Sequence, residues 1–149
     1  MKSIYEASTL RELTQRIDLL KPDTQRQWGK MDVGQMMAHC SAALEISLGD
    51  KPLKRSLMGI LIGGFARKVI TDEKPFKQNM PTVGEFIVRD AREFDKERQR
   101  LKVLLTRMSQ GGMKGMENRK HPFFGPLTPM EWSNSQFKHL DHHLRQFGV

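Results

Sequence analysis

The sequence predicts an all-α fold, a bundle of four main helices with one additional short helical segment. Apolar residues recur at intervals of three and four along much of the chain, which is the spacing of one buried helix face. Residues that cap helices stand before several of these stretches. No run of alternating, β-branched residues competes with them. A chain of 149 residues without a repeat or a long linker is the size of one domain, residues 1–149.

The first helix is expected to begin with Ser8 or Thr9 as its cap, because both side chains can accept a hydrogen bond from the first turn. It is expected to run to about Leu20, since Pro22 cannot continue a helix. Its apolar residues have the spacing of a buried stripe, which consists of Leu10, Leu13, Ile17 and Leu20.

Asp32, a good N-cap residue, predicts the start of the second helix, which is expected to run from Val33 to about Leu48. Gly49 and Pro52 then interrupt the pattern. Residues 53–70 are expected to form a short or irregular helix, because their apolar and basic residues suit a helix while three glycines weaken it.

The longest helix is expected to start at Val83 or Gly84 and to end at Ser109, before a glycine-rich loop that closes with the sequence HPFFGPLTP. Its charged side is expected to be a solvated surface and not a site. The residues expected on its buried side are Phe86, Ile87, Phe94, Leu101, Leu104, Leu105 and Met108.

The final helix has the strongest start signal in the sequence. Thr128 stands as N-cap, Pro129 occupies the first helical position and Glu131 the third, which together form a capping box. The helix is expected to run to Gln146 or Phe147.

Composition argues against several classes of protein. The net charge is +8, but the basic residues are scattered and no aromatic residues are interleaved with them, so nucleic-acid binding is not expected. The longest apolar run, residues 57–65, is roughly half the length that spans a bilayer. The N-terminus lacks the apolar core of a signal peptide and Cys40 is the single cysteine, so a cytoplasmic protein without disulfides is expected.

Histidines carry the chemistry that this sequence suggests. On the final helix His139 and His143 are one turn apart and face the same direction, so both can hold one ion. His142 points roughly 120° or more away from both and is expected to face solvent or to support a ligand. His39 lies on the apolar face of the second helix, where a buried imidazole needs a polar partner.

Three imidazoles from two helices, with water in the remaining positions, are the ligand set of a catalytic metal site. The alternative is that His39 is a hydrogen-bonded core residue and the pair on the final helix an accidental one. Cys40 is expected to be a packing residue. His121 is expected to fix its own loop, and the alternative is that it approaches the pocket. By helical phase, the candidates for residues that line a pocket beside the metal are Gln35, Trp132 and Gln136.

Three blocks of sequence resemble the DinB/YfiT-like superfamily of four-helix metalloproteins, and more closely a subfamily of uncharacterised bacterial proteins within it. They are WGKMDVGQMMAHC at residues 28–40, HPFFGPLTPMEW at 121–132 and HLDHHLRQFG at 139–148. The last is the most specific, because the superfamily carries two of its metal ligands in a His-x-x-His-His cluster of this form. The resemblance implies that His39, His139 and His143 are the ligands, the same set that the helical positions select.

Members of this superfamily include metal-dependent transferases that use low-molecular-weight thiols such as bacillithiol or mycothiol. We therefore expect a metal-dependent enzyme with Zn or Ni at the three-histidine site, acting on a small molecule by thiol transfer or by activating water for hydrolysis. The alternative is a binding or scaffold protein that the metal merely stabilises. Association with a membrane surface or nucleic acid through the basic groups is a weaker third hypothesis. The catalytic residues and the choice between a monomer and a homodimer stay open.

Overall fold

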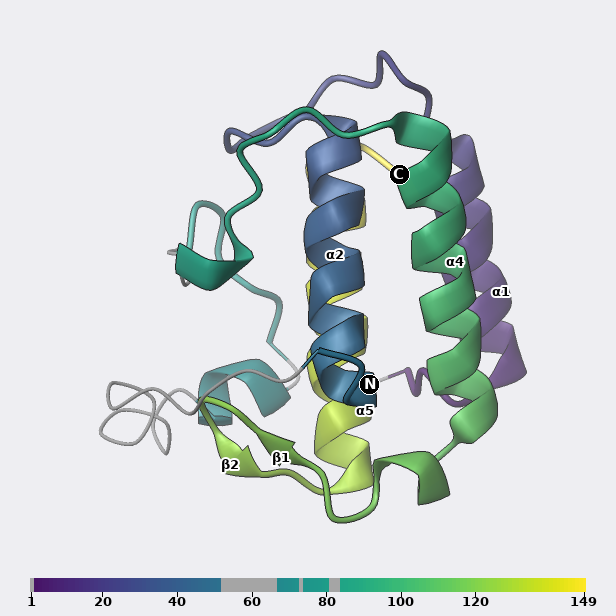
Figure 1. Ribbon diagram of the computed structural model, residues 1–149, viewed down its shortest axis with the longest axis vertical. Helices are drawn as coiled ribbons and strands as arrows, with labels where there is room; N and C mark the ends of the chain where they lie inside the picture. The colour runs from purple at the N-terminus through teal and green to yellow at the C-terminus, as the bar shows by residue number, and fades with distance from the viewer. Residues whose placement is uncertain (1, 52–66, 73, 81–83) are drawn as a thin grey trace.

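In the described part of the chain, four long helices form the body of the protein, so the predicted all-α fold is confirmed (Figure 1). The computed structural model describes residues 2–51, 67–72, 74–80 and 84–149. The long helices are α1 (Ala7–Leu19), α2 (Val33–Leu48), α4 (Phe94–Gly111) and α5 (Pro129–Gln146). The shorter elements are the 3₁₀ turns η1 (Gly84–Phe86) and η2 (Lys114–Met116) and the antiparallel strands β1 (Lys120–His121) and β2 (Gly125–Pro126).

The helices α2 and α5 lie at the centre of the molecule and are covered on two sides. In Figure 1, α5 lies behind α2, and α4 and α1 lie to their right. On the left, the segment that contains η1 and the β1–β2 hairpin lies beside the same two helices. Each central helix therefore has one side for the bundle core and another side that the connecting segments cover.

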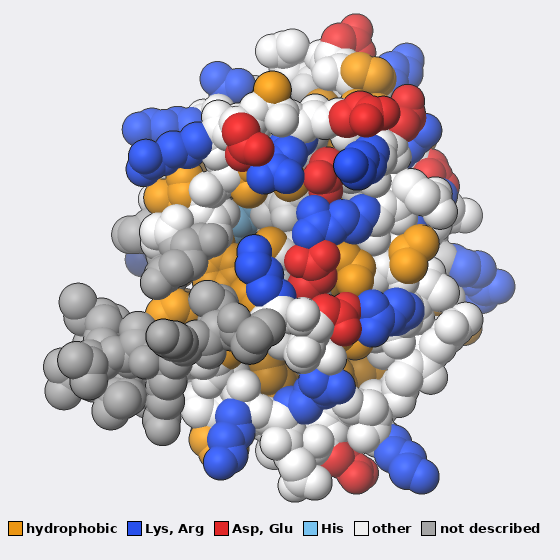
Figure 2. Space-filling view, in the orientation of Figure 1, with side chains coloured by type: hydrophobic (Ala, Val, Ile, Leu, Met, Phe, Trp, Pro, Cys, Tyr) orange, Lys and Arg blue, Asp and Glu red, His pale blue; other side chains and the backbone are white. Residues whose placement is uncertain are grey.

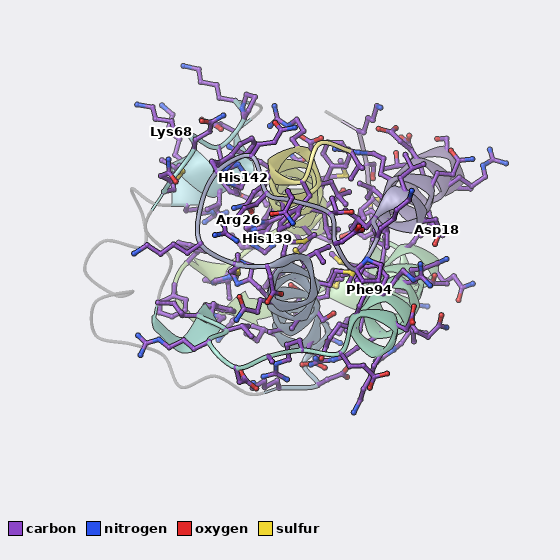
Figure 3. All side chains as sticks on the ribbon, turned by 90° about the horizontal axis from the view of Figure 1, so that it is seen from above. Asp18, Arg26, Lys68, Phe94, His139 and His142 are labelled. Carbon is purple, nitrogen blue, oxygen red and sulfur yellow. The ribbon has the colours of Figure 1, made fainter. Side chains whose placement is uncertain are left out.

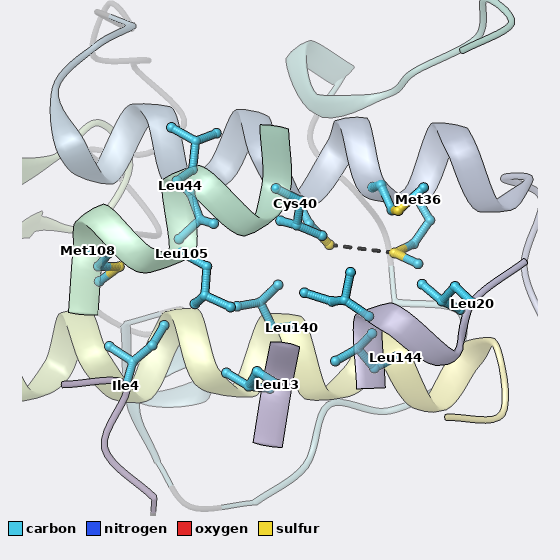
Figure 4. Close-up of a cluster of buried hydrophobic side chains, with 14 of the residues drawn as sticks. Ile4, Leu13, Leu20, Met36, Cys40, Leu44, Leu105, Met108, Leu140 and Leu144 are labelled. Atoms are coloured by element: carbon cyan, nitrogen blue, oxygen red, sulfur yellow. Dashed lines mark hydrogen bonds between the residues drawn. The ribbon is translucent and has the colours of Figure 1, made fainter. Parts of the chain in front are cut away.

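The hydrophobic core fills the space between α1, α2, α4 and α5 (Figure 4). Its side chains are mostly Leu, Ile and Met, and each of these contributes about 1.5–3 kcal/mol by leaving water. Cys40 belongs to this core, as expected of a packing residue. The labelled members in Figure 4 are Ile4, Leu13, Leu20, Met36, Cys40, Leu44, Leu105, Met108, Leu140 and Leu144.

The predicted caps of α2 and α5 are confirmed, and both helices begin and end where the sequence predicts. The side chain of Asp32 accepts a hydrogen bond from the backbone N–H of Gln35 at the start of α2. Gly49, with φ of 77°, ends that helix in the left-handed conformation that favours glycine. Thr128 and Glu131 form the predicted capping box of α5.

The predicted cap of α1 is wrong, because the helix begins at Ala7 and Ser8 and Thr9 lie inside its first turn. The segment before the helix is fixed by long-range contacts. Ile4 is buried in the core, and its backbone N–H donates to the hydroxyl of Ser133 on α5 at 2.9 Å. These contacts, and not a side-chain cap, set the start of α1.

The prediction for α4 is wrong over about ten residues, since the helix begins at Phe94 and not at Val83 or Gly84. Residues 81–83 lie outside the described part of the chain, and residues 87–93 are not helical. Ile87, expected to be buried, is 45% exposed. The carbonyl oxygen of Phe86 accepts a hydrogen bond from His39, which lies far away in the sequence. A helix would use that oxygen internally, so the tertiary contact replaces the local pattern.

The charged side of α4 is not wholly a solvated surface, which corrects a second expectation for this helix. Glu97 is buried, and its carboxylate accepts a hydrogen bond from the guanidinium of Arg100 at 2.9 Å. The same guanidinium donates to Glu45 of α2 at 2.6 Å. This ion-pair network joins α4 to α2.

Most of the irregular helix expected at residues 53–70 lies outside the described residues, while residues 67–71 are helical. None of the described helices is long and apolar enough to cross a membrane. On the face shown in Figure 2, basic and acidic side chains are interspersed and do not form one basic patch.

Candidate metal centre

The structure brings together the three histidines that the sequence singles out. His39 projects from α2, and His139 and His143 project from α5. The ring centroids of each pair are 4.8 Å apart. One nitrogen from each ring lies within 4.8 Å of the other two. In Figure 3, His139 lies beside α5 on the side away from Asp18 and Phe94, which belong to α1 and α4. The cluster thus lies on the opposite side of α2 and α5 from the bundle core.

Helix geometry explains why these rings meet. His139 and His143 are four residues apart on α5, so their side chains lie on the same face. Leu140 and Leu144, each one residue further on, turn into the core and pack α5 against the other helices (Figure 4). His39 comes from the neighbouring α2, which packs against α5. The apolar faces therefore set the spacing of the two helices that carry the imidazoles.

The ring of His39 is held in one orientation by a backbone carbonyl. Its Nδ1 lies 2.8 Å from the carbonyl oxygen of Phe86. Because that oxygen can only accept, Nδ1 carries the proton and Nε2 presents a lone pair. Nε2 faces the other two rings, at 2.8 Å from Nε2 of His139.

His143 is held in the same way by a side chain. Its Nδ1 donates to Oε1 of Gln146 at 2.8 Å. The amide group of Gln146 is itself oriented, because its Nε2 donates to the carbonyl oxygen of Trp28 at 2.7 Å. His143 therefore also carries its proton on Nδ1 and leaves the lone pair of Nε2 for another partner.

His139 completes a donor set that fits a divalent metal ion. Two nitrogen lone pairs 2.8 Å apart repel each other unless a proton or a cation lies between them. Nitrogen ligands of Zn²⁺ lie about 2.0–2.1 Å from the metal, and so about 3.3 Å from one another in tetrahedral geometry. The Nδ1 atom of His139 is buried and has no hydrogen-bond partner among the described residues.

Burial keeps the three imidazoles neutral at pH 7. It lowers the pKa of His39 and lowers the pKa of His143 to about 3. The pKa of His139 is lowered well below its usual value, first by burial and then by the neighbouring imidazoles. Neutral imidazole is the form that binds metal ions.

His142 lies outside the cluster, as predicted, but it does not face solvent. Its side chain is only 8% exposed. Its ring packs against Trp28 and Phe76, with 5.8 Å between the centroids in each case. These residues come from segments distant in the sequence that cover this side of α5, which the helical pattern alone cannot reveal. His142 is therefore a buried neighbour of His143.

The contacts of His121 and Cys40 do not involve the three clustered imidazoles. Nδ1 of His121 accepts a hydrogen bond from the backbone N–H of Phe123 at 3.1 Å, and its ring stacks on Phe124. The expected role of His121 in fixing its own loop is confirmed. Cys40 contacts the sulfur of Met36 in the core, and burial raises the pKa of its thiol, which therefore stays protonated.

The observed contacts of the three pocket candidates lie away from the histidine cluster. Gln35 completes the cap of α2 and donates to the carbonyl oxygen of Asp90 at 3.3 Å. Gln136 donates to the hydroxyl of Ser47 at 2.8 Å. Trp132 packs against His121. None of these contacts involves the three imidazoles, so a role for these residues beside a substrate stays a prediction.

Two groups that orient the cluster were missed by the sequence analysis. Gln146 could have been found, because it follows His143 by three residues and shares its helix face. The carbonyl of Phe86 has no local signal, since it contacts His39 from 47 residues away.

The buried state of His121 predicts a measurable dependence of stability on pH. Burial lowers its pKa from 6.5 to about 4 in the folded protein. Its contribution to stability is therefore complete above pH 6.5 and is lost as the pH falls towards 4, because the unfolded chain takes up the proton first. Between pH 7 and 4.5, we expect the wild type to lose about 2 kcal/mol more stability than His121→Gln. Urea unfolding of both proteins at the two pH values measures this difference. Equal losses would contradict the prediction.

A recess of about 390 Å³ lies near the end of α5, and its lining does not include the three histidines. The residues that line it carry two side-chain amides, an indole and a guanidinium. They are Gln27, Trp28, Gln78, Arg145, Gly148 and Val149.

Comparison with known proteins identifies a family for almost the whole length of the sequence. A family model described as "Protein of unknown function (DUF1569)" matches residues 4–148. No curated protein and no solved structure matches the chain. The matched region includes both helices that carry the three histidines.

Proposed function

Because the chain belongs to the DUF1569 family, whose description assigns no function, we propose one from the geometry of the histidine cluster. The protein is a metal-dependent enzyme that binds a divalent ion, Zn or Ni, through His39, His139 and His143. The observation that carries this proposal is the orientation of two of the rings. His39 and His143 both donate from Nδ1 to a carbonyl oxygen, so both present Nε2 lone pairs to the cluster.

Three protein ligands leave at least one coordination position for a substrate or for water. An ion there would lower the pKa of a coordinated water or hold a substrate thiol as its thiolate. In the described part of the chain, the group consists of three neutral imidazoles without a carboxylate. The site therefore supplies no negative charge of its own and favours an anionic ligand.

We further propose that the protein is related to the DinB/YfiT-like metalloproteins. The arrangement of ligands supports this, because one histidine comes from α2 and two come from the last helix of a four-helix bundle. A low-molecular-weight thiol is then the expected class of substrate, and thiol transfer or hydrolysis the expected reaction.

Elemental analysis of the purified protein tests the metal site directly. We expect about one divalent ion per chain in the wild type and much less in His143→Ala, because two imidazoles bind an ion far more weakly than three. Small thiols with electrophiles, and separately activated esters, then test the reaction. Turnover that disappears on chelation and in His143→Ala supports the enzyme. A wild type that binds no metal even when it is supplied would contradict the proposal.

One observation favours a second function, a metal-stabilised scaffold. His39 and His143 are buried, and an ion between them would link α2 to α5. Metal binding that raises stability without turnover of any thiol or ester would favour this alternative.

A further inference from the structure

We propose that Gln146 is a positioning residue for the histidine cluster, one that fixes the tautomer of His143, while residues 27–29 hold its own amide in place. This inference rests on the proposed metal site for its consequence, but the hydrogen bonds that support it belong to the chain itself. Gln146 lies at the end of α5 and its side chain is only 4% exposed.

The side-chain oxygen, the side-chain nitrogen and the backbone carbonyl of Gln146 all make hydrogen bonds. Its Oε1 accepts from Nδ1 of His143 at 2.8 Å, and its Nε2 donates to the carbonyl oxygen of Trp28 at 2.7 Å. Its backbone carbonyl accepts from the backbone N–H of Gln27 at 2.8 Å. The side chain thus connects a proposed ligand at one end to the segment before α2 at the other.

Gly29 shows that this side chain and the segment are fitted to each other. Its φ of +82° lies in the left-handed region, and a Cβ atom built there would lie 2.3 Å from Nε2 of Gln146. Another residue would be strained by this φ, and its Cβ would have to displace the amide of Gln146. The backbone at Gly29 therefore lies in direct contact with the amide that holds His143.

The tautomer of His143 is the chemical consequence. While Oε1 of Gln146 accepts the Nδ1 proton, the lone pair of Nε2 stays directed into the cluster. Without this acceptor, the proton can move to Nε2, where it would block binding of a metal. Groups that orient metal-bound histidines in this way typically change metal affinity by about 10–100-fold when they are removed.

Of the two carbonyl groups that hold the cluster, only that of Gln146 belongs to a side chain, since His39 is held by the backbone of Phe86. Substitutions can therefore separate the effects of its two side-chain hydrogen bonds, to His143 and to Trp28. Gln146→Met removes both hydrogen bonds at similar volume. Gln146→Glu keeps an acceptor for Nδ1 of His143 but cannot donate to the carbonyl of Trp28.

Zinc affinity, measured by competition with a chromophoric chelator, distinguishes the effects of these two hydrogen bonds. We expect Gln146→Met to bind Zn²⁺ about 10–100-fold more weakly than the wild type, and Gln146→Glu to stay within a few-fold of it. Ser133→Ala is the control, because it removes buried hydrogen bonds from the same helix at its other end. It should keep wild-type affinity. Equal affinities in wild type and both Gln146 variants would overturn the proposal. Equal losses in both variants would also overturn it, because they would assign the effect to the anchoring of Trp28.

Nitrogen NMR of the metal-free protein gives a second readout that needs no metal. We expect His143 to be the Nδ1–H tautomer in the wild type and in Gln146→Glu, and to shift towards Nε2–H in Gln146→Met. An unchanged tautomer in Gln146→Met would overturn the inference even if zinc binding fell. If the wild type binds no zinc, the proposed function fails, while the tautomer still decides the role of Gln146.

Discussion

Replacing His39 with alanine is expected to abolish the stabilisation of the protein by zinc. His39 is the only one of the three clustered imidazoles that comes from α2. In His39→Ala, the remaining two rings both belong to α5, so an ion can no longer link the two helices. A ligand that binds only the folded state stabilises it by about 2.7 kcal/mol at 100 times its dissociation constant. For a chain of this size, that corresponds to a rise in Tm of roughly 5–10 °C.

Thermal melts with zinc and with a chelator measure this rise in Tm, the zinc increment. We expect the increment in the wild type and its absence in His39→Ala. His121→Gln is the matched control, because it replaces another histidine whose contacts lie outside the cluster. It should keep the full zinc increment. A normal increment in His39→Ala, or its loss in His121→Gln, would place any zinc site elsewhere in the chain.

The parts of the structure that could be predicted are those whose signals are local. Thr128 and Glu131 lie within one turn of each other and set the start of α5 without help from the rest of the chain. His139 and His143 are likewise one turn apart, so their common face follows from helix geometry alone. His39 could be paired with them because its own helix also has a local start signal at Asp32.

The parts that could not be predicted depend on contacts between distant segments. The apolar residues Phe86 and Ile87 suggested an early start for α4, but the carbonyl of Phe86 is used by His39 on α2. The helical pattern places His142 either in solvent or beside a ligand as its support. In the structure, Trp28 covers its ring from a segment more than a hundred residues away. In both cases the contacting residue is distant in the sequence, so the residues around Phe86 and His142 do not indicate it.

Replacing Leu105 with alanine is expected to lower the free energy of unfolding by about 2–5 kcal/mol. Leu105 is fully buried on α4 and packs in the core between the long helices (Figure 4). Its truncation removes apolar contacts and leaves a cavity that the surrounding helices fill only in part. Val103→Ala is the matched control, because Val103 lies on the same helix but is 47% exposed. Its substitution should change the stability by less than about 0.5 kcal/mol. Urea unfolding without metal measures both effects.

The same variant tests whether the core and the histidine cluster are energetically separate. Leu105 packs on the side of α2 and α5 that faces α1 and α4, whereas the three imidazoles lie on the other side. Substitutions without shared partners usually have additive effects. We therefore expect Leu105→Ala to keep the wild-type zinc increment at temperatures well below its lower Tm. If the increment falls together with the stability, the spacing of α2 and α5 at the cluster depends on the packing of this core, and the two sides act as one unit.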